Sequence, residues 1–218
     1  MSTEKVYNLI ILDESGSMSS IMEPTISGFN EVVQTIKGIE KKFPEQEHFI
    51  SLVTFNGLGI KTFLDKTPVV SLNEINSNSY HPDSMTPLFD AIGLSVLKLK
   101  MDVAGIENVN VLVTILTDGE ENASKEFNHP QVNKIISEQK SLGWTFTYIG
   151  ANHDVEKVAR SISITNTMAF RTNKPDMSAL FLKENLARER YSQKLRDKKD
   201  TQTGFYDEDD NPSESPIS

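Results

Sequence analysis

The alternation of short apolar runs with longer amphipathic segments constrains the fold of this 218-residue chain more than any other feature. The runs indicate strands at Val6–Leu12, Phe49–Phe55, Val109–Leu116, Thr145–Ile149 and Thr167–Phe170. The first four are apolar at most positions, as strands covered by helices on both faces must be. The segments between them repeat apolar residues at helical spacing, which predicts helices at Ile26–Ile39, Leu88–Leu99, Gln131–Leu142 and Val155–Ile162. Strand, crossover helix and parallel strand in succession predict an α/β fold of three layers, α/β/α.

The order of the strands follows from one short connection. The run Ile60–Leu64 comes just after Asn56-Gly57, which predicts a hairpin and an antiparallel edge strand. With this hairpin on one side of the first strand and the later strands on the other, we expect a Rossmann-like, mostly parallel sheet in the order 3-2-1-4-5-6. Ligands of such sheets bind outside the carboxyl ends of the strands, where the order reverses, here between Val6–Leu12 and Val109–Leu116.

Both strands at this reversal end in an acid, Asp13 in "LDESGS" and Asp118 in "LTDGEEN". Like charges a few ångströms apart repel unless a cation lies between them, so a divalent metal is the simplest expectation. Ser15 and Ser17 offer hydroxyls at alternate positions, and Thr86 in "MTPLFDA" precedes a predicted helix. Oxygen ligands favour hard ions, Mg²⁺ first and Mn²⁺ or Ca²⁺ next. Such an ion has room for one more anionic oxygen, for which the carboxylate of a partner is the obvious donor.

These residues also have plainer interpretations. Asp-x-Ser-x-Ser occurs in turns that cap a helix, and a Thr before a helix is commonly its N-cap. Glu14, Glu120 and Glu121 are expected to be surface charges of the loops rather than determinants of partner choice. The loop Gly150–Asp154 follows a strand end and either borders the crevice or caps the next helix. The four histidines include no pair at i and i+4, so a histidine metal centre is not expected.

The chain resembles a von Willebrand factor A domain, whose metal-ion-dependent adhesion site is Asp-x-Ser-x-Ser followed by a Thr and an Asp. The matching residues here are Asp13, Ser15, Ser17, Thr86 and Asp118, and the resemblance extends over about residues 4–172, with "TFTYIGANHD" similar to stand-alone bacterial or phage versions. The resemblance implies that the two serines and the threonine coordinate Mg²⁺ and that the two aspartates act directly or through water. It further implies a non-catalytic module that binds an Asp or Glu of a partner protein, with an ATPase-associated complex as one candidate partner.

The alternative in a different class is a metal-assisted hydrolase that resembles the haloacid dehalogenase phosphatases, which also place an Asp after the first strand. That chemistry needs a second carboxylate two residues later and a Lys near the phosphate. Ser15 occupies the first of these positions, and neither motif contains a lysine. We therefore expect no enzymatic activity.

Composition sets the remaining expectations. The chain has no cysteine, no apolar run of membrane-spanning length and no secretory leader, which predicts a cytoplasmic protein that does not contact membranes. Its net charge of −9 disfavours nucleic-acid binding. We expect a domain over residues 1–175, a helix over 176–200 with a basic, solvated second half, and an acidic, disordered tail over 201–218.

Overall fold

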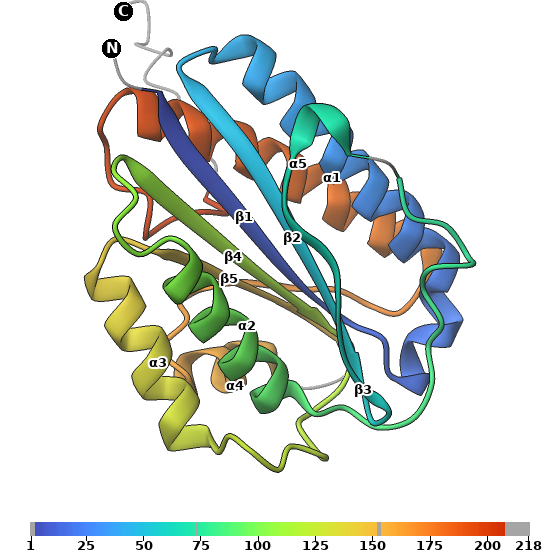
Figure 1. The fold of residues 1–218 in the computed structure, drawn as a ribbon. Coiled ribbons are helices and arrows are strands. Elements are labelled where there is room, and N and C mark those ends of the chain that lie inside the picture. The colour runs from blue at the N-terminus through green and yellow to red at the C-terminus, as the bar shows by residue number, and fades with distance from the viewer. Residues whose placement is uncertain (1–2, 73, 152–153, 208–218) are drawn as a thin grey trace, which may run out of the picture.

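The computed structural model describes residues 3–72, 74–151 and 154–207. One six-stranded sheet runs through the molecule in the order β3-β2-β1-β4-β5-β6 (Figure 1). Its strands are β1 (Glu4–Asp13), β2 (Gln46–Asn56), β3 (Gly59–Pro68), β4 (Val109–Thr117), β5 (Thr145–Gly150) and β6 (Asn166–Ala169). All neighbours are parallel except β2 and β3, which are antiparallel. The predicted order and the predicted antiparallel edge strand are confirmed.

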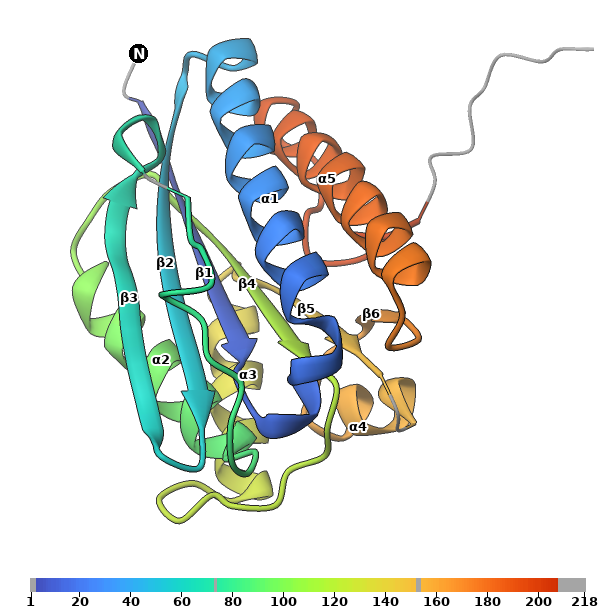
Figure 2. The same ribbon diagram turned by 90° about the vertical axis from the view of Figure 1, so that its right-hand side faces the viewer.

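Helices cover both faces of the sheet (Figures 1 and 2). On one face lie α1 (Met22–Lys42) and α5 (Lys174–Arg196), and on the other lie α2 (Leu88–Asp102), α3 (His129–Ser141) and α4 (Val155–Ser161). Two short 3₁₀ helices, η1 (Gly16–Ile21) and η2 (Val69–Ser71), complete the elements. In β1, Ile10 and Leu12 pack toward α1, whereas Leu9 and Ile11 pack toward α2. Because both faces are buried, the central strands have continuous apolar sequences.

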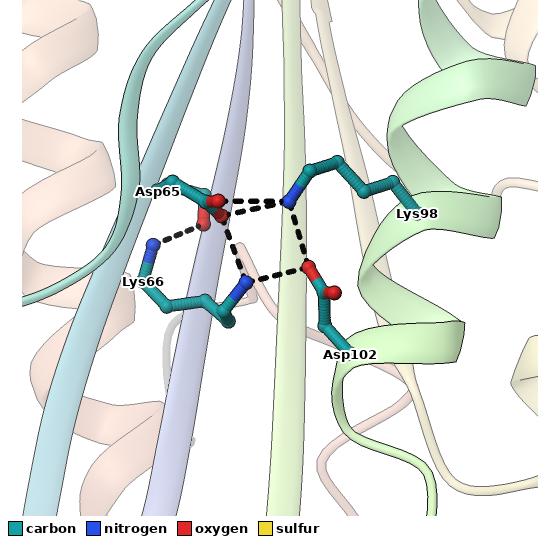
Figure 3. A network of polar contacts seen from close by, with 5 residues as sticks. Asp65, Lys66, Lys98 and Asp102 are labelled. Carbon is teal, nitrogen blue, oxygen red and sulfur yellow. Dashed lines mark hydrogen bonds and ion pairs between the residues drawn. The ribbon is translucent and has the colours of Figure 1, made fainter.

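The exposed edge strand β3 is joined to α2 by a network of four charged side chains (Figure 3). Lys98 Nζ lies 2.9 Å from both carboxylate oxygens of Asp65 and 2.7 Å from Asp102 Oδ2. Lys66 Nζ lies 3.0 Å from Asp65 Oδ1 and 2.6 Å from Asp102 Oδ2. Exposed ion pairs contribute little stability individually, but charges along an edge discourage a foreign strand from pairing there.

The second half of α5 is not simply a solvated face. Arg188 is 2 % exposed, and its Nε donates to Glu184 Oε1 at 2.9 Å. Its other nitrogens donate to Asn8 Oδ1 at 3.0 Å and Thr114 Oγ1 at 2.7 Å, on the strands below. The expectation was wrong for Arg188 alone, which points into the sheet, where hydrogen bonds offset the cost of burying its charge. Other basic residues of the predicted helix over 176–200, such as Lys183, Lys198 and Lys199, are exposed, as expected.

The first residues of the predicted disordered tail are packed against the fold. Phe205 and Tyr206 are buried, the Tyr206 hydroxyl donates to Glu184 Oε2 at 2.7 Å, and the Phe205 N–H donates to Asn166 Oδ1 at 3.1 Å. The prediction was wrong for 201–207 because two aromatic side chains pack against the fold despite the acidic residues that follow. The rest of the predicted tail, 208–218, lies outside the described residues. Within the described part of the chain, no helix has the length and apolar character needed to span a bilayer.

Candidate metal centre

The carboxyl ends of β1 and β4 bring the two predicted aspartates to one place. The strands are parallel neighbours, with Leu12 opposite Leu116, so Asp13 at the end of β1 and Asp118 just past β4 lie at the same edge. The Ser17 hydroxyl donates to Asp118 Oδ1 at 2.6 Å and lies 3.2 Å from the Ser15 hydroxyl. Three of the five predicted ligands therefore contact one another in a chain of oxygens, and Asp13 is joined to them through the Ser15 N–H, 2.7 Å from Asp13 Oδ1.

The fifth residue, Thr86, faces the same space. A Cβ built on Gly119 would lie 3.4 Å from Thr86 Oγ1 and 3.9 Å from Ser17 Oγ, so both hydroxyls border a small cradle that a glycine leaves open. Thr86 is 3 % exposed, whereas Ser17 is exposed. The site is thus shielded from solvent at Thr86 and open to solvent at Ser17.

The capping interpretation of Thr86 is wrong. Helix α2 begins at Leu88, and no side chain at its N-cap position donates or accepts a capping bond. The N–H of Phe89 instead donates to Glu121 Oε2 at 2.8 Å, and the N–H of Asp90 donates to Ser124 Oγ at 3.0 Å. Because the loop after β4 satisfies the start of the helix, the Thr86 hydroxyl is not needed there.

The capping interpretation of Asp-x-Ser-x-Ser has no support either. Ser15 precedes η1, but its side chain makes no capping hydrogen bond. Helix α1 begins at Met22, also without a side-chain cap. The Ser17 hydroxyl donates to Asp118, and the Ser15 hydroxyl contacts Ser17 rather than a helix N–H group.

Burial and charge make the centre favourable for a cation. Asp13 is fully buried, and its Oδ2 accepts a hydrogen bond from the Thr117 hydroxyl at 2.5 Å. Burial, with a further contribution from the nearby charge of Asp118, raises the pKa of Asp13 to about 6 although hydrogen bonds from Thr117 and Ser15 lower it. Two acids held this closely are stabilised by a positive ion, and the oxygen-only set of carboxylates and hydroxyls suits a hard divalent cation. The residues present therefore fit the metal that the sequence predicts.

Several supporting residues escaped sequence reasoning. Thr117 holds Asp13, and the Tyr80 hydroxyl donates to the Asp13 carbonyl at 2.5 Å. Glu14, expected at the surface, is only 1 % exposed. Its Oε1 accepts the His81 N–H at 2.6 Å, and Lys61 Nζ lies 3.8 Å from its Oε2. The position of Thr117, directly before Asp118 at the end of a strand, could have identified its hydroxyl as a neighbour of the two aspartates. Nothing in the sequence marks Tyr80, which approaches from a loop.

The loop after β4 is built around partly buried hydrogen bonds. Glu121 is not a free surface charge, because its Oε1 accepts the N–H groups of Ala123 and Ser124 at 2.9 and 2.7 Å. Asn122 Oδ1 accepts the Thr86 N–H at 2.8 Å, and the Asn122 N–H donates to the Thr86 carbonyl at 3.1 Å. Glu120 is exposed, as expected. This loop thus positions Thr86 and Asp118 together.

The loop after β5 was given two interpretations. Asp154 accepts the Lys157 N–H at 3.1 Å and so caps α4, as one of them predicted. Whether the loop also borders the centre stays a prediction, because Asn152 and His153 lie outside the described residues.

The comparisons with known proteins concern the family and the fold. The family model of the von Willebrand factor type A domain matches residues 9–185. Among solved structures, the chain is similar to a von Willebrand factor type A protein from Catenulispora acidiphila, with 17% identity, a TM-score of 0.52 and coverage of 87% of this chain and 43% of that one. It is also similar to the SpRpn10 VWA domain, with 10% identity, a TM-score of 0.54 and coverage of 82% of this chain and 94% of that one. A third similar structure is the manganese-loaded TRAP protein of Plasmodium vivax, with 14% identity, a TM-score of 0.51 and coverage of 85% of this chain and 75% of that one.

At these identities the structural likeness shows the fold alone, and the chain spans less than half of the Catenulispora structure. No curated protein sequence matches the chain. The family match, however, covers most of the 218 residues and includes all five predicted ligands. The chain belongs to the von Willebrand factor type A domain family.

Proposed function

We propose that this protein is a non-catalytic module that binds a partner protein through a divalent cation, Mg²⁺ first and Mn²⁺ or Ca²⁺ next. Asp13, Ser15, Ser17, Thr86 and Asp118 would hold the ion, which supplies a Lewis-acidic position for one oxygen from outside. The observation that carries the proposal is the cradle at Gly119, where hydroxyls from two loops meet next to the bond between Ser17 and Asp118. The manganese-loaded TRAP structure, of the same fold, supports it.

The surrounding residues support the role of the ligands. Thr117 and the Ser15 N–H each occupy one lone pair of Asp13 and leave others available. Asn122 fixes the backbone of Thr86 on both sides. Such outer contacts orient ligands, and their loss typically weakens metal binding about tenfold or more.

The partner would provide an Asp or Glu carboxylate. Two carboxylates balance the charge of a divalent ion but do not fill its six or more coordination positions. A further anionic oxygen can approach from the exposed side next to Ser17. Hydrolysis is less well supported. A nucleophilic carboxylate must reach its substrate, but Asp13 is fully buried and hydrogen-bonded through both oxygens.

The test compares two serines of one loop. Ser17→Ala should weaken Mg²⁺ binding roughly tenfold or more, measured by titration calorimetry, because an oxygen ligand is lost. Ser19→Ala removes an exposed hydroxyl two residues away and should leave the affinity unchanged. Affinity capture with each variant should recover a partner in Mg²⁺ from the Ser19 variant alone, and from neither in EDTA. A wild-type protein that takes up no Mg²⁺, Mn²⁺ or Ca²⁺ at millimolar concentration would rule out the proposal.

A further inference from the structure

Three basic side chains form a stripe along α5. Lys183, Arg190 and Lys194 are spaced at i, i+7 and i+11, which places them on one side of the helix. Lys183 is exposed and the other two are half-buried. In the part of the chain that the structure describes, none of the three side chains forms a hydrogen bond or an ion pair. This basic stripe therefore carries positive charge that the described fold does not use.

The acids close to the stripe in sequence are already engaged. Glu184 is buried, and Glu189 forms an ion pair with Lys42 of α1. Asp197, which follows α5, accepts a hydrogen bond from Arg196 Nε at 2.9 Å. The charge of the basic stripe is consequently available to an anion from another segment.

The described chain ends beside the stripe. The ring centroid of Phe205 lies 6.0 Å from that of Tyr191, and the Tyr206 hydroxyl donates to Glu184 Oε2 at 2.7 Å. Each of these two partners on α5 directly follows a member of the stripe in the helix. The end of the described chain lies on the side of α5 away from α1 (Figure 2), and Asp207 is exposed there.

The sequence that follows carries the opposite charge. Residues 207–218 contain no lysine or arginine and five acids, which are Asp207, Glu208, Asp209, Asp210 and Glu214. Four of these acids are consecutive and begin where the chain leaves α5. Single ion pairs at a surface are weak. A tethered segment, however, meets its site at an effective concentration on the order of millimolar, so several weak pairs together populate the contact.

The length of the segment matches the surface. Residues 208–218 lie outside the described residues, and eleven extended residues span about 36 Å. Helix α5 has 23 residues and is about 35 Å long. The same helix exposes Leu182 and Leu186, 62 % and 48 % accessible, next to the stripe. A segment that lies along the stripe removes part of this apolar surface from water, which is favourable.

We infer that residues 207–218 dock along the outer side of α5, with their acids on the basic stripe. This face of α5 is thus a binding site for an acidic, extended peptide, and the chain supplies that peptide itself. The inference goes beyond the proposed function, because the contact requires neither the cation nor its ligands. Docking depends on charge, so salt weakens it.

The experiment uses the full chain, which contains no cysteine, so that one introduced cysteine is the only labelling position. A nitroxide attached to Ser215→Cys should broaden the amide NMR signals of residues 182–194 at least twofold more than those of α2 and α3, on the opposite face of the sheet. The effect should be equal in Mg²⁺ and in EDTA. At about 1 M salt, where the Debye length is about 3 Å, most of it should disappear.

A charge reversal separates docking from mere tethering. In the labelled chain, Lys183→Glu/Arg190→Glu/Lys194→Glu should remove the excess broadening at low salt. The matched control, Lys100→Glu/Lys134→Glu/Lys157→Glu, makes the same change of net charge on α2, α3 and α4 and should retain it. The amide spectrum of each variant also reports whether it is folded, and the salt comparison in the wild type needs no variant.

Three results would overturn the inference. The first is a broadening of residues 182–194 that neither salt nor the reversal of the stripe reduces, because tethering alone explains it. The second is the absence of any excess broadening on α5. The third is a broadening that moves to the residues around Ser17 in Mg²⁺, which would place the acids at the metal centre instead. None of the three removes the proposed function, which calorimetry with Mg²⁺ tests separately.

Discussion

At the scale of single residues, His48 shows how burial sets a charge state. It is 2 % exposed and lies near Asn8 and Gln46, with ring nitrogens 3.5 Å from Asn8 Nδ2 and 3.3 Å from Gln46 Oε1. Burial, with a smaller contribution from the charge of Arg188, lowers the pKa of His48 from 6.5 to about 4. The folded protein therefore keeps this imidazole neutral at a pH where the unfolded chain protonates it.

The stability of the fold should consequently depend on pH through His48. Its contribution is full above pH 6.5 and falls as the pH drops toward 4, by about 2 kcal/mol at pH 5, because only the unfolded chain takes up the proton. Urea unfolding of the wild type and His48→Gln in EDTA, at pH 7 and pH 5, measures the difference. Asp13, whose pKa is raised in the folded protein, makes the fold more stable as the pH falls through this range, which is the opposite effect. Because both proteins contain Asp13, the difference between their pH dependences reports His48 alone. Parallel pH dependences would contradict the prediction.

Gly119 is the second residue whose role can be isolated. Gly119→Ala places a methyl group in the cradle beside Thr86 and Ser17 at ordinary contact distances, so the fold should tolerate it within about 1 kcal/mol. The Mg²⁺ affinity should nevertheless fall at least roughly tenfold, as measured by calorimetry, because the methyl group occupies space that the ion needs. Gly38→Ala in α1, where a Cβ meets nothing within 4 Å, is the control and should bind Mg²⁺ as the wild type does. Unchanged affinity in the Gly119 variant would place the metal elsewhere.

At the scale of elements, the start of α2 depends on a loop distant in sequence. Glu121 accepts the Phe89 N–H and the Ser124 hydroxyl through one oxygen, and Asp90 accepts the N–H groups of residues 125–127. A helix N-terminus capped in this way needs no side chain of its own. The position of Thr86 is therefore determined jointly by α2 and the loop after β4.

Two adjacent acids of this loop should behave differently. Glu121→Ala leaves partly buried N–H groups without an acceptor and should lower the free energy of unfolding by about 1–3 kcal/mol, measured in urea. Glu120→Ala removes an exposed charge and should change it by less than about 0.5 kcal/mol. Similar losses in the two variants would mean that Glu121 is not the cap of α2.

At the scale of the whole molecule, the sheet was predictable because its strands are buried on both faces and their apolar runs are continuous. The strand order followed from one hairpin, and the candidate ligands followed from the polar ends of two strands and from a family resemblance. What the sequence did not reveal depends on contacts between distant segments. Tyr80 reaches Asp13 from a loop, the buried carboxylate of Glu14 accepts the N–H of His81, and Arg188 is buried by the sheet beneath α5.

The segment 201–207 is the clearest case, because its neighbours in sequence are acidic while its aromatic residues are buried. Phe205→Ala should destabilise the protein by about 3–5 kcal/mol in thermal or urea unfolding, as expected for the loss of a buried aromatic side chain. Asp207→Ala, at an exposed position next to this segment, is the control and should have little effect. A Phe205 variant as stable as the control would show that the segment does not pack in solution.

Strand β1 carries the chain from Glu4 to Asp13 in one uninterrupted stretch, and ten residues at about 3.3 Å each separate its ends by about 30 Å. A label, surface or carrier attached at the amino end of this strand therefore sits on the far side of the molecule from the serine loop. Immobilised in that orientation, the domain presents the candidate metal centre outward, clear of whatever holds it.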